Sequence, residues 1–171
     1  FWADRSKKPS FSHQFMLISL SYLLTKKDMR YEHIGKDLFI KNRAKLKAKM
    51  KPNSIAIICS NDIMPTNADG TMAFRQNSNL LYFSGIDQEE SVLIVAPDFP
   101  DPKMREILFV RETNELIAVW EGHKYSMEEA TETSGVSTIM WVEKLEGMLN
   151  TLLAETDNIY LYNNEHIRNG T

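Results

Sequence analysis

An uninterrupted apolar run in the first half of the chain most limits what this sequence can fold into. Residues 54–60 read Ser-Ile-Ala-Ile-Ile-Cys-Ser, with no charged side chain among them. Successive side chains of a strand point to opposite faces, so a continuous apolar strand needs apolar cover on both sides. The run therefore predicts a strand in the interior of a sheet that is covered on both faces.

The rest of the chain alternates helical and extended patterns. From Leu38 to Met50 the apolar residues recur at helical spacing, and Pro52 with Asn53 ends the segment. Two strands should flank the proline-containing turn 97–102 as an antiparallel hairpin. We predict an α/β fold in which a mixed β-sheet of about five to six strands is flanked by helices. The predicted strands are 54–60, 79–84, 91–96, 106–111, 136–141 and 158–162, and the later helices are 127–133, ended by Gly135, and 142–153.

The composition is that of a soluble globular protein. Of the 171 residues, 43% are hydrophobic and 25% are charged, which allows one domain with its own core. The net charge of −3 argues against nucleic acid as a partner, because phosphate binding needs a concentrated basic surface. The one basic run, from Lys41 to Lys51, is predicted to be the solvated face of the first helix.

Cys59 is the only cysteine of the chain, so an internal disulfide bond cannot form. This usage predicts a reducing compartment and a cytoplasmic location. Because Cys59 follows the apolar run, we expect a buried structural thiol rather than a nucleophile.

The first 28 residues differ from the rest and are predicted to be an N-terminal extension, disordered or helical, before a domain at 29–171. Arg5, Lys7 and Lys8 precede an apolar run at 15–24. That run is too short to span a bilayer, which takes about 20 apolar residues, and no small-residue cleavage site follows it. No membrane partner is expected. An added extension before Met29, a packed helix and a targeting signal all remain open.

No residue pattern predicts a catalytic or metal-binding site. The four histidines, at 13, 33, 123 and 166, lack a second ligand at helical spacing. Asp62 and Asp69 are interpreted as turn formers. The pair Glu89-Glu90 is interpreted as a solvated turn and Glu128-Glu129 as an exposed helix start, since adjacent carboxylates point apart.

The segment from Phe74 to Gly85 carries the most information. It places five polar residues, Arg-Gln-Asn-Ser-Asn, directly before the aromatic run Leu-Leu-Tyr-Phe. Arg75 offers a rigid fork of donors that can clamp carbonyl groups or a carboxylate, and its amide neighbours can brace a loop. One interpretation is a hydrogen-bonded loop that positions a strand. The other is a role at an interface or a substrate entrance.

This segment resembles the signature of the aminopeptidase P N-terminal domain, an Arg-Gln-Asn/Asp-Ser-Asp/Asn core before an aromatic strand and Thr/Ser-Gly. The resemblance extends over about residues 31–162. Lys124 replaces the usual arginine, and Leu81 stands where some relatives carry a large aromatic residue. Further matches, in order, are Asn42-Arg43 with Leu46, 55–60, Asn67-Ala68-Asp69-Gly70, Leu108-Phe109-Val110, Glu115, Trp120, Gly122, Lys124, Ala130 and Gly135-Val136.

The resemblance implies that the parent protein is a metallopeptidase that removes an N-terminal residue preceding proline. In this family the chemistry belongs to a C-terminal pita-bread domain, where two Asp, one His and two Glu hold two divalent metals, commonly manganese. That catalytic domain is absent from this chain, so no catalytic or metal-binding residue and no cofactor is assigned to it.

The family's N-terminal domain contributes to subunit contacts and limits access to a neighbouring active site. The implied partners are the chain's own catalytic domain, further copies in a homo-oligomer, and a proline-containing peptide. A prolidase or creatinase relative and a non-catalytic protein-binding module with a peptidase-like fold, as in some histone-chaperone subunits, remain open. The candidate interface or entrance residues are Arg75, Asn77, Tyr82, Trp120 and Lys124.

Overall fold

The strand β1 (Ser54–Cys59) lies inside a five-stranded mixed sheet, as the apolar run predicts. The computed structural model describes residues 34–114 and 121–162, so the predicted extension at 1–28 lies outside the described residues. The strand order is β4-β3-β2-β1-β5, with β1/β2 and β2/β3 antiparallel and β1/β5 and β3/β4 parallel. The other strands are β2 (Val92–Val95), β3 (Glu106–Val110), β4 (Thr138–Trp141) and β5 (Asn158–Leu161).

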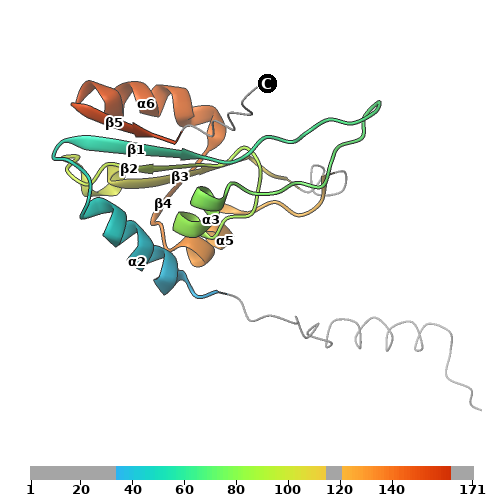
Figure 1. Ribbon diagram of the computed structural model, residues 1–171, viewed down its shortest axis with the longest axis horizontal. Coiled ribbons are helices and arrows are strands. Elements are labelled where there is room, and N and C mark those ends of the chain that lie inside the picture. The colour runs from blue at the N-terminus through green and yellow to red at the C-terminus, as the bar shows by residue number, and fades with distance from the viewer. Residues whose placement is uncertain (1–33, 115–120, 163–171) are drawn as a thin grey trace, which may run out of the picture. The chain divides into compact units, whose positions relative to one another are not determined.

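Helices cover both faces of this sheet (Figure 1). One face carries α2 (Lys36–Lys47), α3 (Ser78–Ser84) and α5 (Met127–Ser134), and the other carries α6 (Leu145–Ala154). Short 3₁₀ turns, η1 (Pro102–Met104) and η2 (Val142–Lys144), precede β3 and α6. The predicted α/β class and mixed sheet are confirmed.

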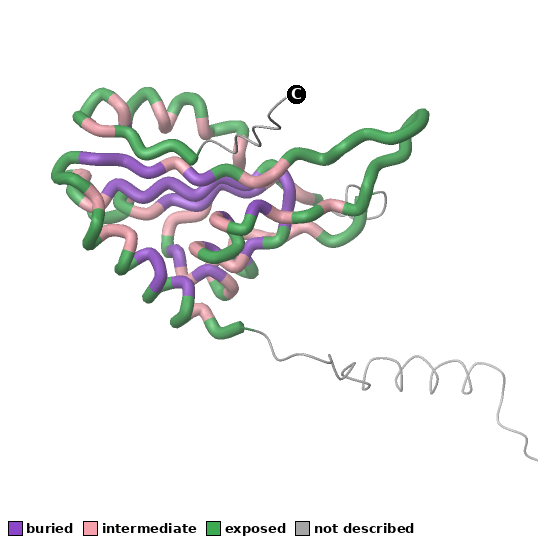
Figure 2. The backbone as a smooth tube through the Cα atoms, viewed as in Figure 1, coloured by how far each residue is buried: buried purple, intermediate pink, exposed green. Residues whose placement is uncertain are grey.

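The two faces of the sheet carry two separate apolar cores. Ala56 and Ile58 pack with Leu80 and Ala130 on the side of α3 and α5. Ile55 is one residue from Ala56, so the alternation of the strand points it to the other face, where it packs with Leu152 of α6. The strand β2 is therefore buried along its whole length and β1 along most of its length (Figure 2).

The prediction of a strand at 79–84 is wrong, because these residues form the short helix α3. Asn77 caps its start by accepting the Asn79 N–H, and Gly85 ends it with a left-handed φ of 73°. A β-carbon on Gly85 would come within 2.4 Å of the Phe39 ring. A four-residue apolar run suits a buried strand or one helical turn, and here the caps on either side select the helix.

The prediction that Cys59 is buried is also wrong. It is the last residue of β1 and is exposed where the chain leaves the sheet. Partial desolvation, and then the nearby Asp62 carboxylate, raise the pKa of the Cys59 thiol above its ordinary value. The thiolate is thus disfavoured, in agreement with the expectation that Cys59 is not a nucleophile.

A buried arginine joins the helical layer to the sheet. The Arg43 side chain is only 1% exposed, and its Nε donates to a carboxylate oxygen of Glu106 at 2.9 Å. Its Nη1 donates to the backbone oxygens of Phe83 at 2.8 Å and Ser134 at 2.9 Å, near the ends of α3 and α5. Lys47 approaches the other oxygen of Glu106 at 2.8 Å but is much more exposed.

We expect Arg43→Met to lower the free energy of unfolding by about 3–5 kcal/mol, because it leaves buried carbonyl groups without a donor. Lys47→Met is the matched control, since it removes a second cation from the same carboxylate at an exposed position, and should cost less than about 1 kcal/mol. Chemical denaturation followed by circular dichroism measures both. Equal effects of the two substitutions would contradict this role of Arg43.

Candidate functional site

Residues 60–77, hereafter the arm, run out from the end of β1 beyond the sheet before the chain returns to α3 (Figure 1). Its two sides are joined by the Met72 N–H, which donates to the Met64 oxygen at 2.8 Å, and by a bridge between Pro65 and Thr71. Most of the arm is exposed, including both methionine side chains (Figure 2). The arm therefore presents apolar surface away from the core.

A tight turn closes the tip of the arm. The Thr66 N–H donates to the Gly70 oxygen at 2.9 Å, and the Gly70 N–H donates back to the Asn67 oxygen at 3.0 Å. Ala68 has a left-handed φ of 53°. Asp69 lies in this turn, which confirms its interpretation as a turn-forming residue.

The base of the arm is held by the side chain of Gln76. Its Nε2 donates to the backbone oxygens of Ile86 at 3.1 Å and Gln88 at 2.7 Å, and its Oε1 accepts the Asn77 N–H at 2.7 Å. One amide thus connects the end of the arm to the turn that follows α3. Because that turn leads directly into β2, the arm is tied to the sheet.

Asn77 and Asn61 complete this connection. Asn77 is buried and caps α3, while its Nδ2 lies 3.4 Å from Oδ1 of Asn61. Nδ2 of Asn61 in turn donates to the backbone oxygen of Arg75 at 3.0 Å. These contacts agree with the interpretation of the polar segment as a brace, although it positions a helix rather than a strand.

Arg75 faces solvent at an open cleft of about 460 Å³ at the base of the arm. Its guanidinium makes no ion pair with any acidic side chain in the ranges 34–114 and 121–162. The cleft combines this free cation with one carboxylate and apolar walls, a lining suited to an amphipathic chain segment. Its lining includes Asp62, Met64, Met72, Phe74, Arg75 and Tyr162.

The other predicted site residues are dispersed. Tyr82 is exposed on α3, where its ring meets that of Phe83 edge-on with centroids 5.0 Å apart. Trp120 lies outside the described residues. Lys124 does not face the cleft but belongs to a separate charged cluster.

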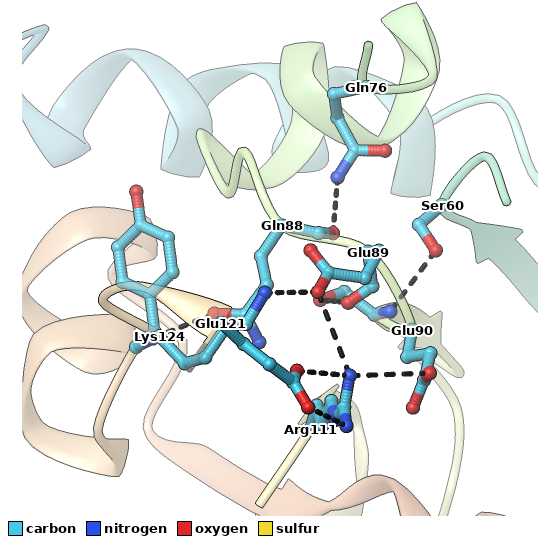
Figure 3. Close-up of polar contacts among 10 residues, drawn as sticks. Ser60, Gln76, Gln88, Glu89, Glu90, Arg111, Glu121 and Lys124 are labelled. Carbon is cyan, nitrogen blue, oxygen red and sulfur yellow. Dashed lines mark hydrogen bonds and ion pairs between the residues drawn. The ribbon is translucent and has the colours of Figure 1, made fainter. Parts of the chain in front are cut away.

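This charged cluster consists of Glu89, Glu90, Arg111, Glu121 and Lys124 (Figure 3). The Lys124 ammonium bonds to the Glu89 carboxylate, and both side chains are at most 10% exposed. Arg111 lies 2.8 Å from Glu121, 3.7 Å from Glu90 and 3.8 Å from Glu89. The cluster ties the turn before β2 to the residues that follow β3 and to the segment before α5.

Opposing effects act on the Glu89 carboxyl. Burial acts to raise its pKa, but hydrogen bonds from Lys124 and from the backbone, with the charges of Lys124 and Arg111, lower the pKa overall. Glu89 is therefore an ionised, paired side chain in the interior, and its interpretation as part of a solvated turn is wrong. Its neighbour Glu90 is exposed and has a left-handed φ of 50°, and its carboxylate lies 3.7 Å from Arg111.

No sequence motif predicted that Arg111 is a site residue, although the predicted hairpin pairs it with an acidic residue. The antiparallel pairing of Val92 with Phe109 places Glu90 opposite Arg111 when the register is continued by two residues. Opposite charges at directly paired positions of a hairpin attract one another. The predicted hairpin therefore contains the pair of Glu90 and Arg111, but the pair can be recognised only when the exact register of the two strands is known.

Metal ligands are not assembled in the described part of the chain. No group of three His, Cys, Asp or Glu side chains comes together there. His123 is exposed, with its Nε2 3.2 Å from Glu129. Glu129 also forms a capping box with Ser126, which confirms the exposed helix start predicted at Glu128-Glu129. Within the described residues, no helix is long and apolar enough to cross a membrane.

The fold and the site define an α/β domain with a braced, projecting arm and an internal ion-pair cluster. The family "Aminopeptidase P, N-terminal domain" matches residues 39–162, which is most of the chain. The chain belongs to this family.

The chain is similar to part of several aminopeptidases. The Xaa-Pro aminopeptidase of Escherichia coli is 28% identical over 127 residues, covering 74% of this chain and 29% of that protein. The structure of Pseudomonas aeruginosa aminopeptidase PepP superposes with a TM-score of 0.71 at 26% identity, covering 78% of this chain and 30% of the other. The Escherichia coli aminopeptidase P structure with the inhibitor Pro-Leu gives 0.70 at 27% identity, covering 80% of this chain and 31% of the other. The chain thus spans less than a third of these relatives.

We expect Glu89→Gln to cost about 3 kcal/mol of stability at neutral pH, because it leaves the buried Lys124 ammonium without its counter-charge. The folded-state pKa of Glu89 is depressed, so its contribution is complete above the unfolded pKa of about 4.3. The contribution is lost as the pH falls through the lower, folded-state value. The stability difference between wild type and Glu89→Gln should accordingly shrink in acid.

Denaturation midpoints measured between neutral pH and strong acid test this dependence. Glu128→Gln, at an exposed position of α5, is the control and should follow the wild-type curve. Wild-type and Glu89→Gln curves that stay parallel throughout the acid range would contradict the assignment.

Proposed function

We propose that this chain is the non-catalytic N-terminal domain of a Xaa-Pro aminopeptidase, a metallopeptidase that releases the N-terminal residue preceding proline. The match of residues 39–162 to the family's N-terminal domain carries this proposal. The relatives' greater length supports it, because about two thirds of each relative has no counterpart in this chain. The chemistry then belongs to the remaining, C-terminal part of the parent protein.

The proposed cofactor is a pair of divalent metal ions, manganese in the first instance, held by the C-terminal domain. The described residues of this chain do not fit such a pair, since they bring no three candidate ligands together. A metal pair supplies a Lewis acid and a source of hydroxide at neutral pH, which suits hydrolysis of a hindered peptide bond. The proposed location of the parent protein is the cytoplasm.

Within the parent protein, we assign the arm and its cleft to subunit contact or substrate access. The arm is braced at its base by Gln76 and Asn77 but exposed over most of its length. Among the residues that the structure describes, Arg75 has no ion-pair partner and lies beside exposed methionines, a combination that suits a peptide chain or an acidic partner surface. Anchoring at one end and exposure at the other fit an element that reaches a neighbouring domain or subunit.

The assignment predicts that the 171 residues alone release no amino acid from a peptide with proline in second position. The parent protein, extended by its own downstream sequence, should release it, and manganese should increase the rate. Liberated amino acid, measured with and without added manganese and after chelation, gives the result. Metal-dependent release by the 171-residue chain, or an inactive parent protein with intact ligands, would refute the proposal.

Arg75→Ala in the parent protein should reduce kcat/KM, or the association constant of the oligomer, by on the order of tenfold, which corresponds to one charge-assisted hydrogen bond. The same substitution should leave the melting temperature of the 171-residue chain unchanged, because the side chain has no ion pair within the described residues. Lys49→Ala, which removes another exposed cation just after the end of α2, is the control. Kinetics and analytical ultracentrifugation measure the two quantities. If both are unchanged in Arg75→Ala, the residue has neither role.

A further inference from the structure

The two sides of the arm bring Met64 and Met72 to directly opposite positions. The Met72 N–H donates to the Met64 backbone oxygen at 2.8 Å, and the next pair toward the tip, Pro65 and Thr71, forms an antiparallel bridge. Opposed residues of an antiparallel pair direct their side chains to the same face. Both thioethers therefore lie on one face of the arm, and both line its cleft.

Exposure separates these two methionines from the others that the structure describes. Met64 is 61% exposed and Met72 is 58% exposed. A peroxide must reach the sulfur atom to oxidise it, so an exposed methionine reacts before a packed one. Within the described residues, oxidation should accordingly begin on the arm. The remaining described methionines are partly buried, and most of them pack against one of the two cores: Met50, Met104, Met127, Met140 and Met148.

Cys59 lines the same cleft but competes poorly for an oxidant. Partial burial, and then the Asp62 carboxylate, raise the pKa of its thiol, and the thiolate is the form that attacks a peroxide. A thioether has no proton to lose, so the reactivity of a methionine does not depend on deprotonation. Met64 and Met72 are therefore the more available sulfur groups of the cleft.

Oxidation changes the property that suits this face of the arm to a contact. Met64, Met72 and Phe74 supply the apolar walls of the cleft. A methionine sulfoxide carries a strongly polar S–O group in place of the apolar thioether. Burying that group against an apolar partner surface is unfavourable unless a donor meets it. Two sulfoxides on one face should therefore weaken any contact that the arm makes.

We propose that Met64 and Met72 form a reversible oxidation site through which hydrogen peroxide weakens the contact made by the arm. The thioether sulfur attacks one peroxide oxygen, the O–O bond breaks and an S–O bond forms, so that sulfur is oxidised and the peroxide is reduced to water. A methionine sulfoxide reductase reverses the step with two thiols, which become a disulfide while the oxygen leaves as water. The inference rests on the proposed function, because it regulates the contact assigned there to the arm.

Peptide mass mapping after graded treatment with hydrogen peroxide tests the site itself. In the 171-residue chain, Met64 and Met72 should each gain one oxygen atom on the order of tenfold faster than Met140 and Met148. The melting temperature should not change at this stage, because both oxidised side chains are exposed. Oxidation of all four methionines at the same rate would refute the site.

The parent protein tests the consequence. Peroxide treatment that oxidises Met64 and Met72 should lower kcat/KM, or the association constant of the oligomer, on the order of tenfold, and a methionine sulfoxide reductase should restore it. In the double variant Met64→Leu/Met72→Leu, the ratio of the treated to the untreated value should stay near one, because leucine is apolar, similar in volume and free of sulfur. Met148→Leu, at a partly buried position of α6, is the matched control and should stay as sensitive to peroxide as the wild type.

A loss of activity or assembly that persists in the double leucine variant would overturn the proposal, because oxidation at another position would then be responsible. Unchanged activity and assembly after complete oxidation of Met64 and Met72 would also overturn it. The outcome is separable from the proposed function. An active aminopeptidase that is insensitive to oxidation of the arm refutes only the oxidation site. A protein that cleaves no peptide, but whose oligomer dissociates on oxidation of the arm and reforms after reduction, refutes only the activity.

Discussion

The arrangement of this domain depends on one buried cation, Arg43, which holds two helix ends against the sheet. Its guanidinium donates to carbonyl oxygens at the ends of α3 and α5 and pairs with Glu106 at the start of β3. The C-terminal end of a helix carries partial negative charge, so a cation is favourable at both positions. Burial strengthens the attraction between Arg43 and its partners. It also makes the removal of any one partner costly, because the groups that remain are buried without a hydrogen bond or a counter-charge.

The two helices that meet Arg43 end in the same way. Ser84 and Ser134 each donate their hydroxyl to the oxygen four residues earlier and accept the N–H two residues later. Glycine follows in both, with left-handed φ, and α2 packs Phe39 and Ile40 where the glycine β-carbons would be. The elements that carry the arm's brace and the charged cluster are thereby fixed relative to the sheet. An exposed arm can hold a defined direction only because its base belongs to this rigid frame.

Much of the fold followed from local pattern. The strands at β1, β2, β3, β4 and β5 and the helices α2, α5 and α6 all lie where periodicity, turns and glycine stops place them. Two wrong predictions concern a short apolar segment and the last residue of a strand. The run Leu80 to Phe83 became a helix because its caps outweighed its composition, and Cys59 is exposed because a strand's last residue need not share the burial of its centre. For the candidate site, the bracing role of Asn77 followed from its residue type, whereas the role of Glu89 did not.

The amino-acid sequence by itself determined the central buried strand, the α/β class and the family, because apolar periodicity and a contiguous motif are local properties of the chain. Tertiary structure alone decided that Lys124 pairs with Glu89 in the interior, that Arg75 has no ion-pair partner within the described part of the chain, and that β5 exposes Ile159 and Leu161. Each of these depends on groups brought together from distant positions. Their charge state and solvent exposure are set by neighbours in space, which sequence separation does not reveal.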